Sequence, residues 1–491
     1  MNNKPGASSI LMPLPSFIED KEGFLTITSN SGIKCAKKFF HVRDLILDQF
    51  SFASNDEIIE FVENDDLSKE EYHLNITQNV VVVTASSSIG IFHGMQTLRQ
   101  LMLSCGAEIP CCEIKDKPMY SWRGFMIDCS RHFFSLIELK KMIDVASLHH
   151  LNIFHWHLTD DQGWRLEIPS LPKLTQVGAK RQNINYEIPM IEHEFYNEEQ
   201  VAELVDYAQK RFITVVPEIE FPGHSRSLLA SYPQYGCVGE NYSVVAHWGI
   251  FEDVLCVGND LVLNLIKEII TYVAKVFPSE YIHIGGDECP TKSWESCPKC
   301  QKKMKQLNIS DERGLQSYIT SEICKIVAGV NKIPIGWDEV LDGTENMHLP
   351  EDLIVMSWRG TSGGKKASAL NHKAIMCPNT AGCYFDYKNY CSFDEPGNLG
   401  VITLNDVAQY SPISSDMSEK QKKMILGGQG NIWSENITFG KNLEYMAYPR
   451  LSVLAERLWN PQDMLSIEKR KSSLINRLRK LDINCYVGPS I

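Results

Sequence analysis

Several features that would define a partner or a compartment are missing from this 491-residue sequence. No apolar run is long enough to cross a membrane, and the start, MNNKPGASSILMPLP, lacks the apolar core of a secretory signal. Basic residues are few, since 48 Lys and Arg against 61 Asp and Glu give a net charge of -13. Binding to nucleic acid or to anionic lipid needs a basic face. We therefore expect a cytoplasmic protein with a small-molecule partner, no nucleic acid and no membrane.

The cysteines lack the regular pattern of a disulfide framework. Their number, fifteen, is odd, and several stand inside apolar strand-like runs, as Cys129 and Cys256 do. This pattern indicates buried free thiols in a reducing compartment. Cys289, Cys297 and Cys300 have part of the spacing of a metal site, but structural zinc uses four ligands, typically with a second such pair. A tight turn into a helix is the favoured interpretation, and we expect no metal and no cofactor.

The chain consists of two regions that differ in sequence pattern. Residues 1–117 contain short strand-like runs, FLTITS and NVVVVTAS, and then an amphipathic helical stretch, SSSIGIFHGMQTLRQLML. This combination predicts a small α+β domain. The second region, 118–491, alternates strand-like and helical runs. It ends in a basic amphipathic stretch over 466–486, which we expect to form a helix that packs against the rest of the protein.

Eight apolar strand-like runs recur in the second region, with helical stretches such as SLIELKKMIDVASLHH and DLVLNLIKEIITYVAKVF between them. The runs are GFMIDCS, NIFHWHL, FITVVPEIEF, YIHIGGDE, IPIGWDE, DLIVMSW, KAIMCPN and MILGGQGNIW. Eight strand-then-helix units over about 340 residues predict an α/β protein with a (β/α)8 TIM barrel.

Acids, histidines and aromatic residues gather where these runs end, the edge at which TIM barrels place their chemistry. They are Asp128, Arg131, His157, Asp160, Asp161, Glu218, Glu220, His224, Asp287, Glu288, Trp337, Asp338, Trp358, Tyr384, Asp386, Trp433 and Glu435. Indole faces stack on sugar rings, and carboxylates accept hydrogen bonds from hydroxyls. No P-loop or GxGxxG motif follows a strand to suggest phosphate binding instead. Hydrolysis of a glycoside is the leading hypothesis.

The adjacent acids Asp287 and Glu288 do not fit the usual glycosidase arrangement. Most of these enzymes place two carboxylates across the scissile bond, roughly 5 to 9 Å apart. Neighbours on a strand point to opposite faces, unless the backbone bends, as Gly285 and Gly286 permit. The pair then acts on two groups of one sugar: Glu288 on the leaving oxygen and Asp287 on a 2-acetamido group that supplies the nucleophile, a known substrate-assisted exception.

Several ordered motifs resemble those of the β-N-acetylhexosaminidases of glycoside hydrolase family 20. They are RGFMIDCSRHF, HWHLTDDQGWR, VPEIEFPGH, HIGGDE, GWDE, YFD, NIWSE and YPRLSVLAERLW, and the similarity covers 118–460. The stretch SSSIGIFHGMQTLRQL is similar to the end of the small domain that precedes the barrel in that family. The resemblance implies an exo-acting, retaining enzyme that hydrolyses terminal β-linked GlcNAc or GalNAc of oligosaccharides or glycoconjugates through an oxazolinium intermediate.

The resemblance also implies roles for individual residues around the reacting bond. Glu288 would be the general acid and then the base, and Asp287 would orient the acetamide and stabilise the positive charge of the intermediate. Tyr384 would hydrogen-bond the acetamide carbonyl oxygen. Asp160 and His224 resemble a pair that supports Glu288 from behind.

The remaining implied roles concern the grip on the sugar. Arg123 and Glu435 resemble residues that bind ring hydroxyls, and Asp386 would lie near the hydroxymethyl group. Three indoles resemble the walls of the pocket for the terminal sugar: Trp337, Trp358 and Trp433. Oligomeric state and the choice between GlcNAc and GalNAc do not follow from the sequence.

Three other functions compete with this one. A conventional two-carboxylate glycosidase would use Glu218 or Asp338 as nucleophile and would accept sugars without the acetamide. A carbohydrate-binding barrel without activity would need to have lost an acid, whereas Glu288 is present. A cysteine-ligated metalloenzyme would lose activity to chelators, and we expect no such effect.

Some of these residues also have purely structural interpretations. An Asp-Glu pair at a strand end is commonly a helix cap, and tryptophans are commonly buried in cores. His157 and Asp161 fit equally well in a hydrogen-bond network beneath the loops. Glu456 and Arg457 are interpreted as a buried ion pair that closes the barrel. Glu218 and Glu220 are left without a role outside the two-carboxylate alternative.

Overall fold

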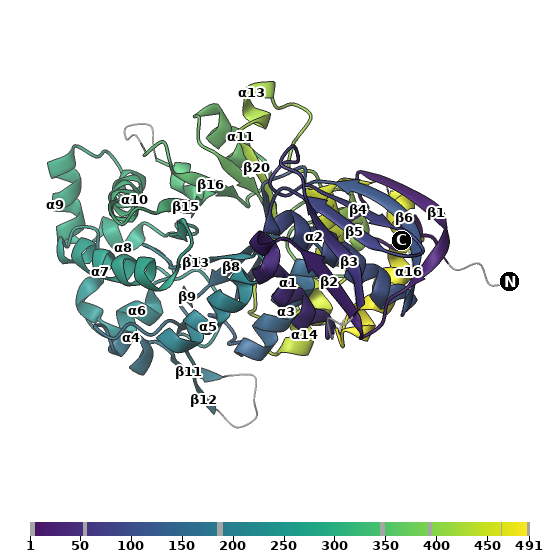
Figure 1. The fold of residues 1–491 in the computed structure, drawn as a ribbon. Coiled ribbons are helices and arrows are strands. Elements are labelled where there is room, and N and C mark those ends of the chain that lie inside the picture. Colours follow the sequence, from purple (N-terminus) through teal and green to yellow (C-terminus); the bar gives the residue numbers. More distant parts are fainter. Residues whose placement is uncertain are drawn as a thin grey trace.

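The computed structural model describes residues 5–52, 56–183, 190–343, 349–390, 395–462 and 464–488. It begins with a six-stranded sheet of order β1-β6-β4-β5-β3-β2. The strands are β1 (Phe17–Thr26), β2 (Ser31–Cys35), β3 (Asp56–Glu63), β4 (Tyr72–Ile76), β5 (Val81–Ala85) and β6 (Glu108–Asp116). Two helices, α1 (Phe40–Phe50) and α2 (Ser88–Cys105), pack on this sheet (Figure 1). Alternate residues of β4 and β5 are buried, as expected of strands with one covered face.

The eight predicted runs form the strands of a closed parallel barrel, in the order β13-β14-β15-β16-β17-β20-β7-β8. The strands are β7 (Trp122–Asp128), β8 (Ile153–His157), β13 (Thr214–Glu218), β14 (Tyr281–His283), β15 (Ile333–Trp337), β16 (Ile354–Ser357), β17 (Ala374–Met376) and β20 (Ile425–Ile432). Every residue of β7 and β8 is buried, because barrel strands are covered on both faces. The TIM-barrel prediction is confirmed.

Helices form an outer layer around the strands (Figure 1). The larger ones are α3 (Leu136–Leu148), α5 (Glu198–Gln209), α7 (Leu261–Val276), α10 (Glu312–Gly329), α11 (Ser362–Ala369), α14 (Gly440–Ala447) and α15 (Arg450–Trp459). Capping boxes define two of their starts, Ser135 with Glu138 and Asn197 with Gln200. In the fifth unit, the described residues after β15 form the 3-10 turn η4 (Asp338–Leu341), and the rest of this connection includes residues 344–348, which lie outside the described part of the chain.

Further helices and strands lie in the connections between the main elements. They are η1 (Ala7–Ser9), η2 (Lys37–Phe39), β9 (Thr159–Asp160), β10 (Gly163–Trp164), α4 (Lys173–Gln176), β11 (Lys180–Asn183), β12 (Met190–His193), α6 (Arg226–Ser231), η3 (Pro233–Tyr235), α8 (Lys292–Glu295), α9 (Pro298–Leu307), β18 (Tyr387–Lys388), β19 (Asn398–Val401), α12 (Leu404–Gln409) and α13 (Glu419–Lys422). Most of them follow the carboxyl ends of barrel strands, which enlarges the loops on that face.

The last helix, α16 (Met464–Lys480), packs against α2 of the N-terminal domain, as expected (Figure 1). Its Arg477 is buried and donates to the Ile10 carbonyl at 2.6 Å. The expected Glu456–Arg457 ion pair is wrong. Glu456 instead pairs with Arg470 of α16 at 2.5 Å. Arg457, the next residue on α15, points away from Glu456 and donates to the backbone carbonyls of Tyr410 and Gln462.

Membrane insertion has no candidate helix in the described part of the chain. None of the helices there combines the length and the apolar character needed to cross a bilayer. The longest ones, such as α2 and α10, are instead amphipathic or buried against the sheet and the barrel.

Candidate active site

A pocket of about 150 Å³ lies at the carboxyl ends of the barrel strands. Eight of the residues predicted from the sequence line it: Asp287, Glu288, Trp337, Trp358, Tyr384, Asp386, Trp433 and Glu435. They come from the ends of β14, β15, β16 and β20 and from the segment after β17. Side chains more than 140 residues apart in the sequence therefore meet because parallel strands all end at one edge of the barrel.

The backbone after β14 explains how two adjacent acids reach one pocket. Gly285 and Gly286 have φ values of +67° and +97°, and Glu288 has +43°. Three left-handed conformations in four residues break the strand alternation that would send neighbours to opposite sides. A side chain at Gly285 would also collide with the carboxylate of Glu220. A left-handed non-glycine residue costs free energy, so the fold holds Glu288 in place against local preference.

His224 connects this pair to two acids from another loop. Its Nδ1 lies 3.2 Å from Asp160 and 3.0 Å from Asp161, and its Nε2 lies 3.6 Å from Asp287 Oδ2 and 3.7 Å from Glu288 Oε2. Burial lowers the pKa of His224, but the carboxylates of Asp160 and Asp287 outweigh it and raise the pKa well above its ordinary value. These carboxylates favour the protonated form of the ring, which lies between two pairs of acids. Asp160 therefore reaches Glu288 only through His224, and the role of this pair as a support for Glu288 stays a prediction.

Beneath the pocket, Glu218 holds a group of ring nitrogens. Its carboxylate lies 2.9 Å from both His155 Nε2 and His283 Nδ1, contacts His157, and accepts from the Trp337 indole at 2.7 Å. This carboxylate is buried and does not line the pocket. It serves to fix the indole of Trp337 as a pocket wall.

Asp338, the other proposed nucleophile of a two-carboxylate enzyme, also lies outside the pocket. It is buried, pairs with Arg359 at 3.0 Å, and lines a separate hollow together with Asp342 and Lys366. Neither Glu218 nor Asp338 is therefore placed to attack a sugar held against Glu288. The remaining pocket carboxylates, Asp386 and Glu435, come from the opposite side of the barrel edge.

Three carboxylate oxygens of the pocket have no hydrogen-bond donor among the residues that the structure describes. They are Asp287 Oδ1, Asp386 Oδ1 and Glu435 Oε2, and all three are buried. A buried acceptor without a donor is costly and rare, so such atoms indicate where a ligand supplies its own donors. Three acceptors facing tryptophan and tyrosine walls suit a ring that carries several O–H or N–H groups.

The electrostatics of the pocket reflect this lack of donors. Burial raises the pKa of Asp287 to about 6, although His224 opposes the shift. Burial, with the Glu435 carboxylate nearby, raises the pKa of Asp386 to about 8. Perturbed acids that gather in one cleft are typical of a reaction site rather than of a structural network.

Comparisons with known proteins agree with this geometry. The model of the glycosyl hydrolase family 20 catalytic domain matches residues 120–462, and that of domain 2 of the same family matches residues 9–117. The chain belongs to glycoside hydrolase family 20. Its enzyme class is accordingly that of the β-hexosaminidases, which are glycoside hydrolases.

Individual members of the family are similar over most of the chain. A β-hexosaminidase of Porphyromonas gingivalis is 39% identical over 437 residues, which are 86% of this chain and 55% of the relative. One of Vibrio furnissii is 32% identical and covers 91% of this chain and 76% of its own length. The crystal structure of a family 20 exo-β-N-acetylglucosaminidase from Vibrio harveyi with N-acetylglucosamine superposes with a TM-score of 0.89 at 28% identity, over 99% of this chain and 80% of that one.

In this family 20 chain, Arg123 does not line the pocket, contrary to the sequence prediction. It is the second residue of β7, at the opposite end of the barrel, where it is fully buried and pairs with Glu70 of the N-terminal domain at 2.5 Å. Burial alone would raise the pKa of Glu70, but His93 and Arg123 lower it to about 2. Arg123 therefore joins the two domains and does not touch a sugar.

Arg131 takes the place that was assigned to Arg123. It follows the carboxyl end of β7, lines the pocket, and lies 2.7 Å from Asp160 and 3.9 Å from Glu435. Its guanidinium also stands over the Trp433 ring at 5.0 Å. The motif RGFMIDCSRHF contains both Arg123 and Arg131. The position of Arg131 at the end of a strand is the signal that distinguishes it from Arg123.

Two pocket residues were missed by the sequence interpretation, Tyr387 and Asn398. Asn398 donates to Asp386 Oδ2 at 2.8 Å, which leaves only the other oxygen free. Both residues belong to the short pair β18 and β19 inside a long loop. Tyr387 stands three residues after Tyr384, which could have suggested it, whereas no pattern in the sequence indicates Asn398.

Proposed function

We propose that this family 20 enzyme removes non-reducing terminal β-linked GlcNAc or GalNAc residues, with retention of configuration and with the acetamide of the substrate as nucleophile. One observation carries the proposal: Asp287 and Glu288 line a single pocket, while Glu218 and Asp338, the protein carboxylates considered as nucleophiles, lie outside it. The structure of the Vibrio harveyi relative, a complex with N-acetylglucosamine, is in line with this substrate class.

In the first step, the side chain of Glu288 gives its proton to the glycosidic oxygen as the bond from that oxygen to the anomeric carbon breaks. The acetamide carbonyl oxygen forms a new bond to the same carbon and yields a cyclic oxazolinium ion. Asp287 accepts the acetamide N–H through its unpartnered Oδ1 and balances the developing positive charge. Tyr384, which stacks near Trp358 with ring centroids 6.2 Å apart, directs the carbonyl oxygen through its hydroxyl.

In the second step, the carboxylate of Glu288 takes a proton from a water molecule that attacks the anomeric carbon. The carbon–oxygen bond of the oxazolinium ring breaks, and the acetamide is restored. Two displacements at one carbon leave the sugar with its original β configuration. Glu288 is suited to both proton transfers because its side chain remains about one-third exposed, within reach of water.

The grip on the rest of the sugar would come from the other side of the pocket. Asp386 and Glu435 offer their free oxygens to ring hydroxyls, while Arg131 holds Glu435 in place. The indoles of Trp337 and Trp433, whose ring centroids lie 5.9 Å apart, form an apolar floor for the C–H face of the ring. His224 is a positioning residue, since it contacts the two reacting acids and not the sugar.

The stereochemistry of the released sugar tests this proposal. We expect proton NMR spectra taken within minutes of adding enzyme to an aryl β-GlcNAc substrate to show the β-anomer of GlcNAc first, with the α-anomer appearing later by mutarotation. A reference sample of dissolved GlcNAc gives the rate of mutarotation under the same conditions. Initial release of the α-anomer would mean a single displacement by water, and the proposed mechanism would be wrong.

A further inference from the structure

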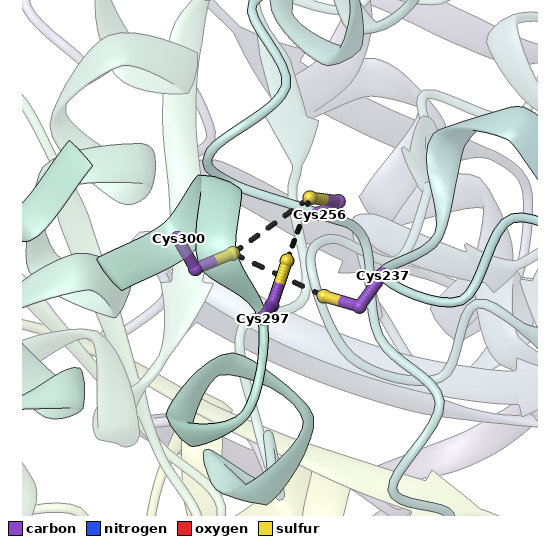
Figure 2. A group of neighbouring side chains, drawn as sticks. All are labelled: Cys237, Cys256, Cys297 and Cys300. Atoms are coloured by element: carbon purple, nitrogen blue, oxygen red, sulfur yellow. Dashed lines mark hydrogen bonds between the residues drawn. The ribbon is translucent and has the colours of Figure 1, made fainter. Parts of the chain in front are cut away.

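Four cysteine thiols form a cluster beside the active-site loops (Figure 2). The sulfur atoms of Cys237, Cys256, Cys297 and Cys300 all lie within 4.8 Å of one another. Cys256 Sγ is 3.7 Å from both Cys297 Sγ and Cys300 Sγ, and Cys237 Sγ is 3.9 Å from Cys300 Sγ. Figure 2 shows the four side chains converging on one central point from separate segments of backbone.

The cluster differs from the partial metal site that the sequence suggested. Cys297 and Cys300 belong to it, but Cys289 does not, since its thiol contacts the Pro290 carbonyl at 3.9 Å. The missing pair comes from the loop after β13. An isolated antiparallel bridge between Gly236 and Leu255 joins the two ends of that loop, next to Cys237 and Cys256.

The distances match a metal centre and do not match disulfides. Zinc bonded to four thiolates at about 2.3 Å in a tetrahedron separates the sulfurs by about 3.8 Å. A disulfide brings one pair to about 2.05 Å and leaves the others outside bonding distance. In the cluster, Cys256 has two equally near neighbours, and the four thiols have no preferred pairing. One central ion satisfies all four sulfurs at once.

The backbone around Cys297 and Cys300 also suits bound thiolates. Cys297 caps the N-terminus of α9, with Pro298 at its first turn, so the helix dipole favours negative charge there. The Gly258 N–H donates to Cys300 Sγ at 3.4 Å, the kind of contact that orients a metal-bound sulfur. A side chain at Gly258 would collide with the backbone of Lys299 and Cys300, so a glycine is required for this close approach.

We propose that Cys237, Cys256, Cys297 and Cys300 bind one zinc ion as a closed structural site. The four thiols lose their protons to solvent and Zn²⁺ takes four sulfur ligands, with no change of oxidation state and no position left for water or substrate. Such a site stabilises the fold and does not take part in the hydrolysis. The inference does not rest on the proposed function.

The zinc ion would join two loops that shape the active site. The segment from Cys237 to Cys256 has no helix or strand, and a long loop of this kind needs an anchor. It contacts the Asp160–Gln162 region, because Gln162 donates to the His247 carbonyl at 3.0 Å. The other loop carries Glu288 and reaches Cys297 nine residues later. The ion would therefore hold the loop around the reacting acids against its neighbour.

Metal analysis of the purified full chain, grown with zinc in the medium and dialysed against metal-free buffer, tests the proposal. We expect inductively coupled plasma mass spectrometry to find one zinc per chain. The double variant Cys297→Ser, Cys300→Ser should lose all of it. A matched control, Cys324→Ala, removes a buried thiol on α10 outside the cluster and should keep the full zinc content.

A spectroscopic measurement on the unaltered chain covers the case in which the double variant does not fold. Replacing the bound metal with Co²⁺ should give the intense thiolate-to-cobalt absorption and the visible bands of a tetrahedral four-sulfur site, and added zinc should abolish them. Any one of four results would overturn the proposal. They are a zinc content below one-tenth of an equivalent, iron in place of zinc, zinc retained by the double variant, and disulfides among these four cysteines in peptide mapping.

Discussion

Replacing Glu288 with Gln is expected to lower kcat on an alkyl β-GlcNAc substrate by about 10²- to 10⁴-fold, the range that general acid–base catalysis contributes. The amide keeps the shape of the side chain but cannot deliver a proton to the leaving oxygen. KM should change much less than kcat, because the proton is transferred only as the glycosidic bond breaks. Steady-state kinetics on the purified variant and on the wild type measure both constants.

The leaving group makes this prediction sharper. An aryl group that leaves readily needs little protonation, so the loss in the bond-breaking step should be much smaller on a 4-nitrophenyl substrate than on an alkyl one. Glu295→Gln is the matched control, since this exposed glutamate lies seven residues further on, in α8, outside the pocket. An equal loss for both leaving groups, or a loss in the control variant, would contradict the assignment of Glu288 as the acid.

Replacing Asp287 with Asn is expected to lower kcat by about 10²- to 10³-fold, the loss seen when one electrostatic stabiliser of a charged intermediate is removed. The carboxamide can still accept a hydrogen bond from the acetamide N–H, but it carries no charge to balance the oxazolinium ion. Because the charge develops only along the reaction, the loss should appear in kcat more than in KM. Kinetics with an aryl β-GlcNAc substrate measure the separation of the two effects.

The pH dependence of the wild type should report the same group. Burial raises the pKa of Asp287 to about 6, so its carboxylate form, which the mechanism requires, is lost as pH falls through about 6. On the acid side of the profile, we expect kcat/KM to fall about tenfold for each pH unit below this value. The variant Asp287→Asn should lack this limb, because it has no carboxylate to protonate at that position.

A control separates this effect from a general loss of charge. Asp260→Asn removes an exposed carboxylate whose partner is Lys303, far from the pocket lining, and should leave both kcat and the acid limb unchanged. If Asp287→Asn retained the kcat of the wild type, or kept the same acid limb, then Asp287 would not be the group that balances the intermediate.

Much of the fold could be predicted because buried parallel strands have a strong signature. Runs such as NIFHWHL and YIHIGGDE are short and rich in apolar and aromatic residues, and eight of them in succession leave few alternatives to a closed barrel. The turn η4 in the fifth unit could not be predicted in this way, because periodicity gives no rule for how a crossover is filled.

Position along a strand explains which of the candidate residues share the pocket. Asp287, Trp337 and Tyr384 follow strand ends, and they do meet in one pocket. The assignment of Arg123 to the pocket was wrong because a single motif contains two arginines that are eight residues apart. A strand advances about 3.3 Å per residue, so the two lie on opposite ends of the barrel, and only Arg131 reaches the pocket.

The four-cysteine cluster could not be predicted from spacing, since the ligand pairs stand in separate loops. Cys237 and Cys256 reach Cys297 only because the loops after two neighbouring strands, β13 and β14, fold onto each other. The loop conformations depend on contacts such as the Trp294 indole with the Leu255 carbonyl at 2.9 Å, which no local pattern encodes.

The most direct test of substrate assistance compares initial rates on two aryl β-glycosides that differ only at C2, one with an acetamido group and the other with a hydroxyl. If the sugar supplies its own nucleophile, only the acetamido substrate will turn over, and the hydroxyl analogue will stay at the background rate even at high enzyme concentration. Comparable rates on both substrates would contradict the account, because a carboxylate of the protein would then have to form the bond to the anomeric carbon.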